Sequence, residues 1–246
     1  MRIGIGIGLT MARVGNFTPA ALPGLSAWYD PSDLSTLFQD DAMTIPVTTA
    51  GQSVAVIKDK SGNGYNLTQA TAAARPLYKT DGTLHWLEGD GVDDILTGTI
   101  PISAYPFTIA AAFKPISTTD GGIAGLYQGE SDYKSLMVNN YLRAVDRTSA
   151  QTQQASVTSS GAPPATAAIA SFTGTSCELT TQSYMTSATG FTQTFGSQTD
   201  FRLFSLRNSN RWNGRIYAAA VISGTLNASD KTSLLQWLAS RVGITL

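Results

Sequence analysis

The sequence has few charged residues. Asp, Glu, Lys and Arg make up 13% of its 246 residues, which is about half of the usual share. The 16 basic and 17 acidic residues nearly cancel, for a net charge of -1. Because duplex nucleic acid is bound largely through neutralised phosphates, a chain without a basic surplus is not expected to bind it, and an anionic membrane is equally unsupported as a partner. A polar but mostly uncharged surface favours an extracellular or particle-bound protein.

Cysteine and histidine each occur once, as Cys177 and His85. A single thiol cannot form an internal disulfide, and the alternating run SCELTTQSYM predicts that Cys177 is a strand residue facing the core. One histidine excludes a histidine-rich zinc site, and the apolar residues around His85 predict an ordinary strand position for it. The motifs G-x-S-x-G, H-E-x-x-H, C-x-x-C and Walker A are all absent. No run approaches the ~20 apolar residues that a transmembrane helix needs.

Short apolar or alternating segments dominate what is present. Between residues 25 and 224, about ten such runs are separated by Gly, Asn, Asp and Pro, which predicts an all-β antiparallel sandwich or barrel. RIYAAAVIS is apolar on both faces and predicts a central strand covered on both sides. The run KSLMVNNYLRAV predicts a single strand. Residues 148–164 fit either a long loop or an exposed strand around QQASV.

One helix is predicted, over residues 228–242. Asn227 or Ser229 can cap its first turn, and Asp230 lies where a negative charge suits the helix dipole. Apolar residues recur at helical spacing around Trp237 until Gly243 ends the pattern. The helix is amphipathic, so we expect its Leu/Trp stripe to pack on the sheet.

The opening stretch, MRIGIGIGLT, alternates glycine with large apolar residues. It is not a dinucleotide-binding loop, because the third glycine of G-x-G-x-x-G is missing and Pro19 follows in place of a helix. Its three glycines and the lack of an A-x-A site disfavour an export signal. The pattern predicts a flat strand that docks on another chain. The predicted assembly residues are Ile3, Ile5, Ile7 and Leu9.

Three segments of the chain form a recognisable set: LPGLSAWYDPSDLSTLFQDDA, VIKDKSGNGYNLTQATAAARPLYKTDGTLHWLEGDGVDDIL and NGRIYAAAVISGTLNASDKTSLLQWLASRVGITL. Through them the chain resembles, over about residues 22–246, the concanavalin A-like (laminin G-like) jelly-roll domains of bacteriophage virion and tail proteins. The resemblance implies an antiparallel β-sandwich of the jelly-roll type over residues 25–246, preceded by an extended arm over residues 1–24. Such domains bind sugars, cleave them or serve as structural modules, so the fold alone sets no function. Relatives often carry an acidic residue where this chain has Ala218.

The sequence does not favour catalysis. A glycosidase needs two carboxylates that flank the scissile bond, and this chain has three widely separated glutamates, Glu88, Glu130 and Glu178. Related glucanases place acids in an E-x-D-x-E pattern, whereas the run EGDGV begins with Glu88 and Asp90 but ends on Val92. We therefore expect no enzymatic activity, with glycoside hydrolysis as a remote alternative.

Calcium is the one cofactor that the sequence leaves open. The DKSGNG segment reads as a turn, since an EF-hand would require Glu where Ala70 stands. Two clusters of loop carboxylates could hold a hard cation. The candidate metal ligands are Asp40 and Asp41 in one cluster and Asp90, Asp93 and Asp94 in the other.

Sugar recognition commonly combines aromatic rings with amide and carboxylate groups. The residues of this kind in loop-like contexts are Tyr127, Tyr133, Asn140, Tyr141, Asn210 and Trp212. They are the predicted carbohydrate-binding residues.

The resemblance and the composition together favour a non-enzymatic structural protein on the surface of a bacteriophage virion, as a head decoration, fibre or tail component. It would be made in the host cytoplasm and anchored to other virion proteins by its arm. A homo-oligomer is expected, and the resemblance favours a trimer. The alternative function is a carbohydrate-binding adhesin module of a tail fibre, which recognises a host surface glycan.

Overall fold

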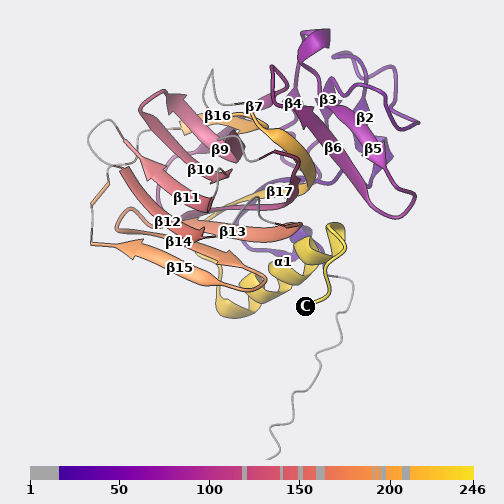
Figure 1. The fold of residues 1–246 in the computed structure, drawn as a ribbon. Coiled ribbons are helices and arrows are strands. Elements are labelled where there is room, and N and C mark those ends of the chain that lie inside the picture. The colour runs from indigo at the N-terminus through magenta and orange to yellow at the C-terminus, as the bar shows by residue number, and fades with distance from the viewer. Residues whose placement is uncertain are drawn as a thin grey trace, which may run out of the picture.

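The computed structural model describes residues 17–117, 121–138, 141–148, 152–158, 164–190, 192–193, 195, 198–206 and 211–246. Two antiparallel sheets form a sandwich with one α-helix at the C-terminal end (Figure 1). The predicted all-β sandwich with a C-terminal helix is confirmed. The predicted assembly residues Ile3, Ile5, Ile7 and Leu9 lie outside the described residues.

Sheet A has eight strands. They are β1 (Leu25–Tyr29), β5 (Leu77–Thr80), β6 (His85–Asp90), β8 (Phe107–Pro115), β13 (Thr166–Phe172), β14 (Ser176–Thr181), β15 (Met185–Thr189) and β17 (Asn213–Ser223). The order is β15-β14-β13-β8-β17-β6-β5, and β1 also pairs with β17. As predicted, β17 is central and its residues from Ile216 to Ile222 are buried.

Sheet B has nine strands in the order β12-β11-β10-β9-β16-β7-β4-β3-β2. They are β2 (Leu37–Phe38), β3 (Val56–Ile57), β4 (Leu67–Thr68), β7 (Leu96–Ile102), β9 (Gly121–Gly129), β10 (Asp132–Val138), β11 (Tyr141–Arg147), β12 (Thr152–Thr158) and β16 (Gln198–Leu203). Three short 3₁₀ helices complete the described elements: η1 (Pro19–Ala21), η2 (Leu34–Thr36) and η3 (Ala72–Ala74).

Two sequence predictions about sheet B need comment. The single strand predicted for KSLMVNNYLRAV is wrong, because the chain forms two strands, β10 and β11, that pair antiparallel with Val138 opposite Leu142. The apolar alternation continues through both strands, so periodicity alone does not reveal the reversal between them. For residues 148–164 the structure decides in favour of a strand, since β12 pairs with β11 along its whole length.

The main core lies between the two sheets. It contains the inward-facing residues of both, including Phe113, Phe172 and Phe201. Cys177 is also fully buried there, as its place in the alternating run predicts. Its thiol therefore packs as a small apolar group.

Helix α1 (Ala228–Arg241) covers the outer face of sheet A and contacts β8, β13 and β17. Asn227 caps it by accepting a hydrogen bond from the backbone N–H of Asp230. Trp237 packs edge-on against Trp28, with 5.7 Å between the ring centroids. The strands beneath present alanines, among them Ala218, and small side chains let a helix approach a sheet closely. The predicted packing of the Leu/Trp stripe is confirmed.

The folded body begins earlier than the sequence indicates. Leu22 is buried in the cluster beneath α1, and Phe17 packs against the same cluster. Residues 17–24, predicted as part of an extended arm, therefore lie on the outer face of sheet A. The Pro and Gly residues of this segment suggest a linker. Its apolar residues nevertheless pack against the cluster between α1 and sheet A.

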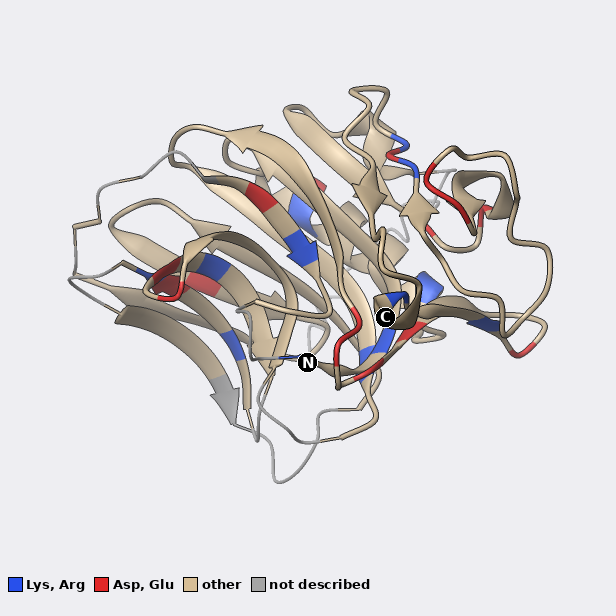
Figure 2. Ribbon diagram, turned by 90° about the horizontal axis from the view of Figure 1, so that it is seen from above, with Lys and Arg blue, Asp and Glu red and all other residues tan. Residues whose placement is uncertain are grey.

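Charged residues are sparse on the ribbon, and positive and negative ones often lie next to each other (Figure 2). This agrees with the low charge of the sequence. No helix in the described part of the chain is long and apolar enough to cross a membrane.

Candidate functional site

Six side chains form a line across the outer face of sheet B, which we call the cross-strand row. Backbone pairing places its members side by side on neighbouring strands. In order across the sheet they are Thr152 on β12, Arg147 on β11, Tyr133 on β10, Tyr127 on β9, Asp200 on β16 and Thr99 on β7. The residues that alternate with them, such as Leu136 and Phe201, face the core. Because adjacent strands lie about 4.8 Å apart, the row extends over about 24 Å.

Tyr127 is the half-buried aromatic residue of the row. The guanidinium carbon of Arg202 lies 3.6 Å from its ring centroid. Arg202 is in turn ion-paired with Asp200, with Nη2 2.7 Å from Oδ2. The Tyr127 hydroxyl donates a hydrogen bond to Oε1 of Glu130 at 3.1 Å. Burial, followed by this hydrogen bond, raises the pKa of Tyr127, so the hydroxyl remains a donor at neutral pH.

Tyr133 is the buried member of the row. Its side chain is only 2% exposed, and the guanidinium carbon of Arg147 lies 5.7 Å from its ring centroid. It packs with Met137, Val145 and Leu206 in a small apolar cluster. The sequence predicts Tyr133 as an open sugar platform, and this needs correction: its ring is a buried support beneath Arg147.

Leu206, which follows β16, packs on the outer face of sheet B with Tyr133, Met137 and Val145. Its side chain is fully buried. A methyl group at Gly122 or Gly125 of β9 would collide with Leu206, so glycines at these positions allow the close approach. The covered part of the face contains Met137, while the cross-strand row lies beside it.

The remaining predicted sugar-binding residues separate from the row. Tyr141 is 42% exposed on β11, six residues and therefore about 20 Å from Arg147 along the strand. Trp212 is fully buried in the main core, edge-on to Phe113. The prediction that Trp212 is a ligand platform is therefore wrong, since the core covers its ring. Asn140 and Asn210 lie outside the described residues.

A buried ion pair lies directly under the row. Lys134 and Asp146 are cross-strand partners on the core side of β10 and β11, and both side chains are fully buried. The ammonium of Lys134 lies 2.9 Å from Oδ1 of Asp132 and 3.3 Å from Oδ1 of Asp146. It also donates to the backbone carbonyl of Arg147 at 3.0 Å. The Tyr105 hydroxyl donates to the other Asp146 oxygen at 2.7 Å. Burial raises the pKa of Asp146, and the nearby ammonium opposes this shift.

The structure brings together one of the two predicted acidic clusters. Carboxylate oxygens of Asp90, Asp93 and Asp94 lie within 4.8 Å of one another at the β6–β7 connection. Asp94 is 5% exposed and accepts a hydrogen bond from the backbone N–H of Asp90. Burial, with added repulsion from the two neighbouring carboxylates, raises the pKa of Asp94 from 3.8 to about 6. Three close oxygens are the donor type that Ca²⁺ prefers. Ion binding there stays a prediction.

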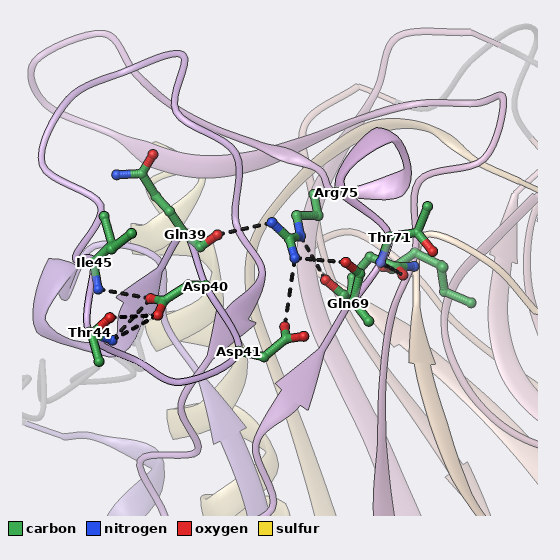
Figure 3. Close-up of polar contacts among 10 residues, drawn as sticks. Gln39, Asp40, Asp41, Thr44, Ile45, Gln69, Thr71 and Arg75 are labelled. Carbon is green, nitrogen blue, oxygen red and sulfur yellow. Dashed lines mark hydrogen bonds and ion pairs between the residues drawn. The ribbon is translucent and has the colours of Figure 1, made fainter.

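The other predicted cluster does not form. Asp40 uses its carboxylate to close a turn, accepting hydrogen bonds from Thr44 and from the backbone N–H of Ile45 (Figure 3). Asp41 instead points to Arg75, with Oδ1 3.8 Å from Nη2. The two side chains serve different structural contacts, so the prediction of a shared cation site at this loop is wrong.

His85 occupies the predicted strand position, on β6. Its Nδ1 lies 2.6 Å from the Tyr78 hydroxyl. The ring lines a small cavity of about 50 Å³ beside Arg241, at the end of α1. A volume of that size accommodates one or two water molecules. The contact to Tyr78 supports a structural role.

Sequence reasoning missed the arginine and aspartate of the row. Alternation in YLRAVDR places Arg147 on the same face as Tyr141, and alternation in DFRL places Asp200 with Arg202. That signal identifies which residues share a face within one strand. Alternation does not show which of the two faces is turned outward. It also does not show which residues of neighbouring strands stand opposite one another.

No family model matches the sequence, and no curated protein matches it. Solved structures do share its fold. Domain 4 of AbnA, a GH43 extracellular arabinanase from Geobacillus stearothermophilus in complex with arabinotriose, is 17% identical with a TM-score of 0.59, over 86% of this chain and 98% of that one. A GH54 α-L-arabinofuranosidase is 13% identical with a TM-score of 0.59, over 89% and 63%.

Botulinum neurotoxin type C has the same fold in part. It is 14% identical with a TM-score of 0.56, over 74% of this chain and 48% of the toxin chain. This chain therefore spans about half the length of that solved chain, and likewise 48% of the chain of the botulinum neurotoxin type G receptor-binding domain. These likenesses define the class of fold. It is an antiparallel β-sandwich, and the jelly-roll arrangement that the sequence predicts is consistent with it.

Proposed function

We propose that this chain is a non-catalytic carbohydrate-binding module whose ligand lies along the cross-strand row. The observation that carries the proposal is the row itself. It presents an aromatic ring at Tyr127, donors at Arg147 and a carboxylate at Asp200, in one line across six strands. Rings and fixed polar groups in such a line match the alternating C–H and hydroxyl surfaces of an extended sugar chain.

The likeness to solved structures supports the proposal by analogy of fold. Domain 4 of the arabinanase is in complex with arabinotriose, and botulinum neurotoxin type C interacts with two ganglioside molecules. Those ligands belong to those proteins, and no particular sugar is carried over to this chain.

The contacts of the acidic residues favour binding over hydrolysis. Asp200, the one carboxylate within the row, is held by Arg202 at 2.7 Å. Glu88 is held by Arg215 and Glu178 by Lys231. A glycosidase would need a protonated acid and a second carboxylate on either side of one bond, and the row offers no such pair among its described members.

The test is a glycan array followed by titration calorimetry on the strongest ligand, with the intact chain and two variants. Tyr127→Ala removes the ring of the row and is expected to weaken binding about two- to tenfold, since a stacked ring contributes about 0.5–1.5 kcal/mol beyond its buried area. Tyr184→Ala is the matched control, because Tyr184 is 64% exposed in the β14–β15 turn of the other sheet. The Tyr184→Ala variant should bind the glycan with the same affinity as the unmodified chain. Saturable binding that both variants retain would place the ligand elsewhere.

A display role on a bacteriophage virion is the second candidate function, and it rests on the resemblance of the sequence. One observation indicates how such a module would be oriented: Phe17 packs against the apolar cluster between sheet A and α1, on the side of the sandwich opposite to the cross-strand row. Attachment through residues 1–16 to other virion proteins would thus leave the row facing away from the particle. We propose that the module is displayed in this orientation, as a trimer.

Deleting residues 1–16 tests the display role without disturbing Leu22. The shortened chain should keep its melting temperature and lose incorporation into phage particles, seen by imaging and immunoblotting. Incorporation of the shortened chain at the normal level would refute anchoring through this segment. Native mass spectrometry of the full chain tests the predicted trimer. A mass three times that of the chain supports it, and the mass of a monomer contradicts it.

A further inference from the structure

Arg147 has no ion pair with a described residue, a property that it shares with Arg211, whose guanidinium instead donates a 2.6 Å hydrogen bond to the Ser205 hydroxyl. The Arg147 guanidinium makes one hydrogen bond, from Nη1 to the Tyr133 hydroxyl at a long 3.4 Å, besides lying over the Tyr133 ring. No carboxylate of a described residue lies within the 4 Å that an ion pair requires. By contrast, Arg202, Arg215 and Arg241 each have a carboxylate at 3.3 Å or less.

The carboxylates around this end of the row already have cations closer to them than Arg147. Asp200 is paired with Arg202, and Asp132 and Asp146 share the Lys134 ammonium beneath the sheet. Arg147 is half-buried, so its charge is screened less than that of an exposed side chain. A guanidinium with unused N–H groups in such a setting favours an anionic partner with paired oxygens.

The position of Arg147 is also fixed before any ligand arrives. Lys134 donates to its backbone carbonyl from the core side, and the buried Tyr133 ring supports its side chain from below. Pre-organisation of this kind lowers the entropy lost when a ligand is ordered. The two contacts come from neighbouring positions of one strand, β10, so they are set by the fold.

We propose that the cross-strand row selects anionic sugars, with Arg147 binding the carboxylate or sulfate group. The inference rests on the proposed carbohydrate-binding function and names its ligand class. The planar guanidinium pairs with two oxygens of the anion, while Tyr127 and Asp200 contact the neutral part of the sugar chain. Neutral glycans would lack the group that compensates Arg147.

The test uses a glycan array on which each acidic glycan has a neutral counterpart: sialylated with asialo, uronate with methyl ester, and sulfated with desulfated. Titration calorimetry on the strongest pair then compares the unmodified chain with Arg147→Gln and Arg147→Lys. The unmodified chain should prefer the anionic member about ten- to a hundredfold, as expected for a hydrogen-bonded charge pair. Arg147→Gln should bring the ratio to about one. Arg147→Lys should keep part of the preference, because it retains the charge without the planar fork.

Lys114→Gln is the matched control. Lys114 is exposed on the outer face of sheet A, so this variant removes one positive charge far from the row and should keep the full preference. Equal binding of neutral and anionic members overturns anionic selection but leaves the carbohydrate-binding function standing. A preference that Arg147→Gln retains overturns the role of Arg147. Absence of binding to every glycan on the array overturns the proposed function itself.

Discussion

Arg202 lies over the Tyr127 ring, with its guanidinium carbon 3.6 Å from the ring centroid, and it forms an ion pair with Asp200. Arg202 thus links two members of the cross-strand row, Tyr127 and Asp200, and it stands two residues after Asp200 on the same face of β16. The cation–π contact predicts energetic coupling between Arg202 and Tyr127. In a double-mutant cycle with Arg202→Ala and Tyr127→Ala, we expect a coupling of about 0.5–1 kcal/mol in the free energy of unfolding. Urea denaturation measures it, and additive effects would show that the contact contributes no stability.

The buried pair of Lys134 and Asp146 predicts a large and asymmetric mutational effect. Lys134→Ala leaves the Asp146 carboxylate in the core without its cation and should cost about 3–5 kcal/mol of unfolding free energy. The double variant Lys134→Met with Asp146→Leu replaces both charges by apolar groups and should recover most of that loss. Lys114→Ala, at an exposed position, should stay within about 0.5 kcal/mol of the unmodified chain. A double variant as unstable as the single one would contradict this account.

Asp94 predicts a specific pH dependence of stability. Its pKa in the folded protein, about 6, exceeds its ordinary value of 3.8, so the folded state binds the proton more tightly than the unfolded state. The stability that Asp94 contributes is therefore complete below about pH 4 and is lost as the pH rises through about 6.

The variant Asp94→Asn resembles the protonated form at every pH. It should be more stable than the unmodified chain at pH 7, by up to about 3 kcal/mol, and should show no advantage below pH 4. Chemical denaturation between pH 4 and 7 in EDTA measures the difference, with Asp93→Asn as the neighbouring control. An advantage of Asp94→Asn that does not change with pH would assign the effect to packing.

Calcium binding at Asp90, Asp93 and Asp94 is the fourth prediction. An ion held by these oxygens would bind only the folded chain, so millimolar CaCl₂ should raise the melting temperature, and more so at higher concentration. Asp94→Asn should abolish this response, because it removes the buried ligand. Asp40→Asn should leave the response intact, because the Asp40 carboxylate is engaged in a turn. A melting temperature that CaCl₂ does not change would exclude calcium at this cluster.

Much of the fold could be predicted from the sequence. The alternation around Cys177, the two-sided apolar run of β17 and the capped pattern after Asn227 are local signals, and each residue lies where its signal indicates. Such signals arise because a strand or helix repeats with a fixed period, so that one element's own side chains reveal its type and buried face.

The site could be predicted only in part. Tyr127 could be identified as an aromatic residue with polar neighbours in the sequence. Trp212 has similar neighbours, yet it is buried in the core. Nothing in the sequence indicates that Arg147 and Asp200 belong to the same row, since they are 53 residues apart in the chain. Their alignment depends on β-strand register, which pairs residues through hydrogen bonds between distant segments.

By itself, then, the sequence determined the class of fold, the central strand, the helix and its cap, because these depend on periodicity and local hydrogen bonding. The tertiary structure alone decided that Tyr133 is buried under Arg147, that Asp40 closes a turn, and that six side chains from six strands stand in one row. The physical reason is that burial and cross-strand proximity result from long-range pairing and packing, which a pattern within one segment does not encode.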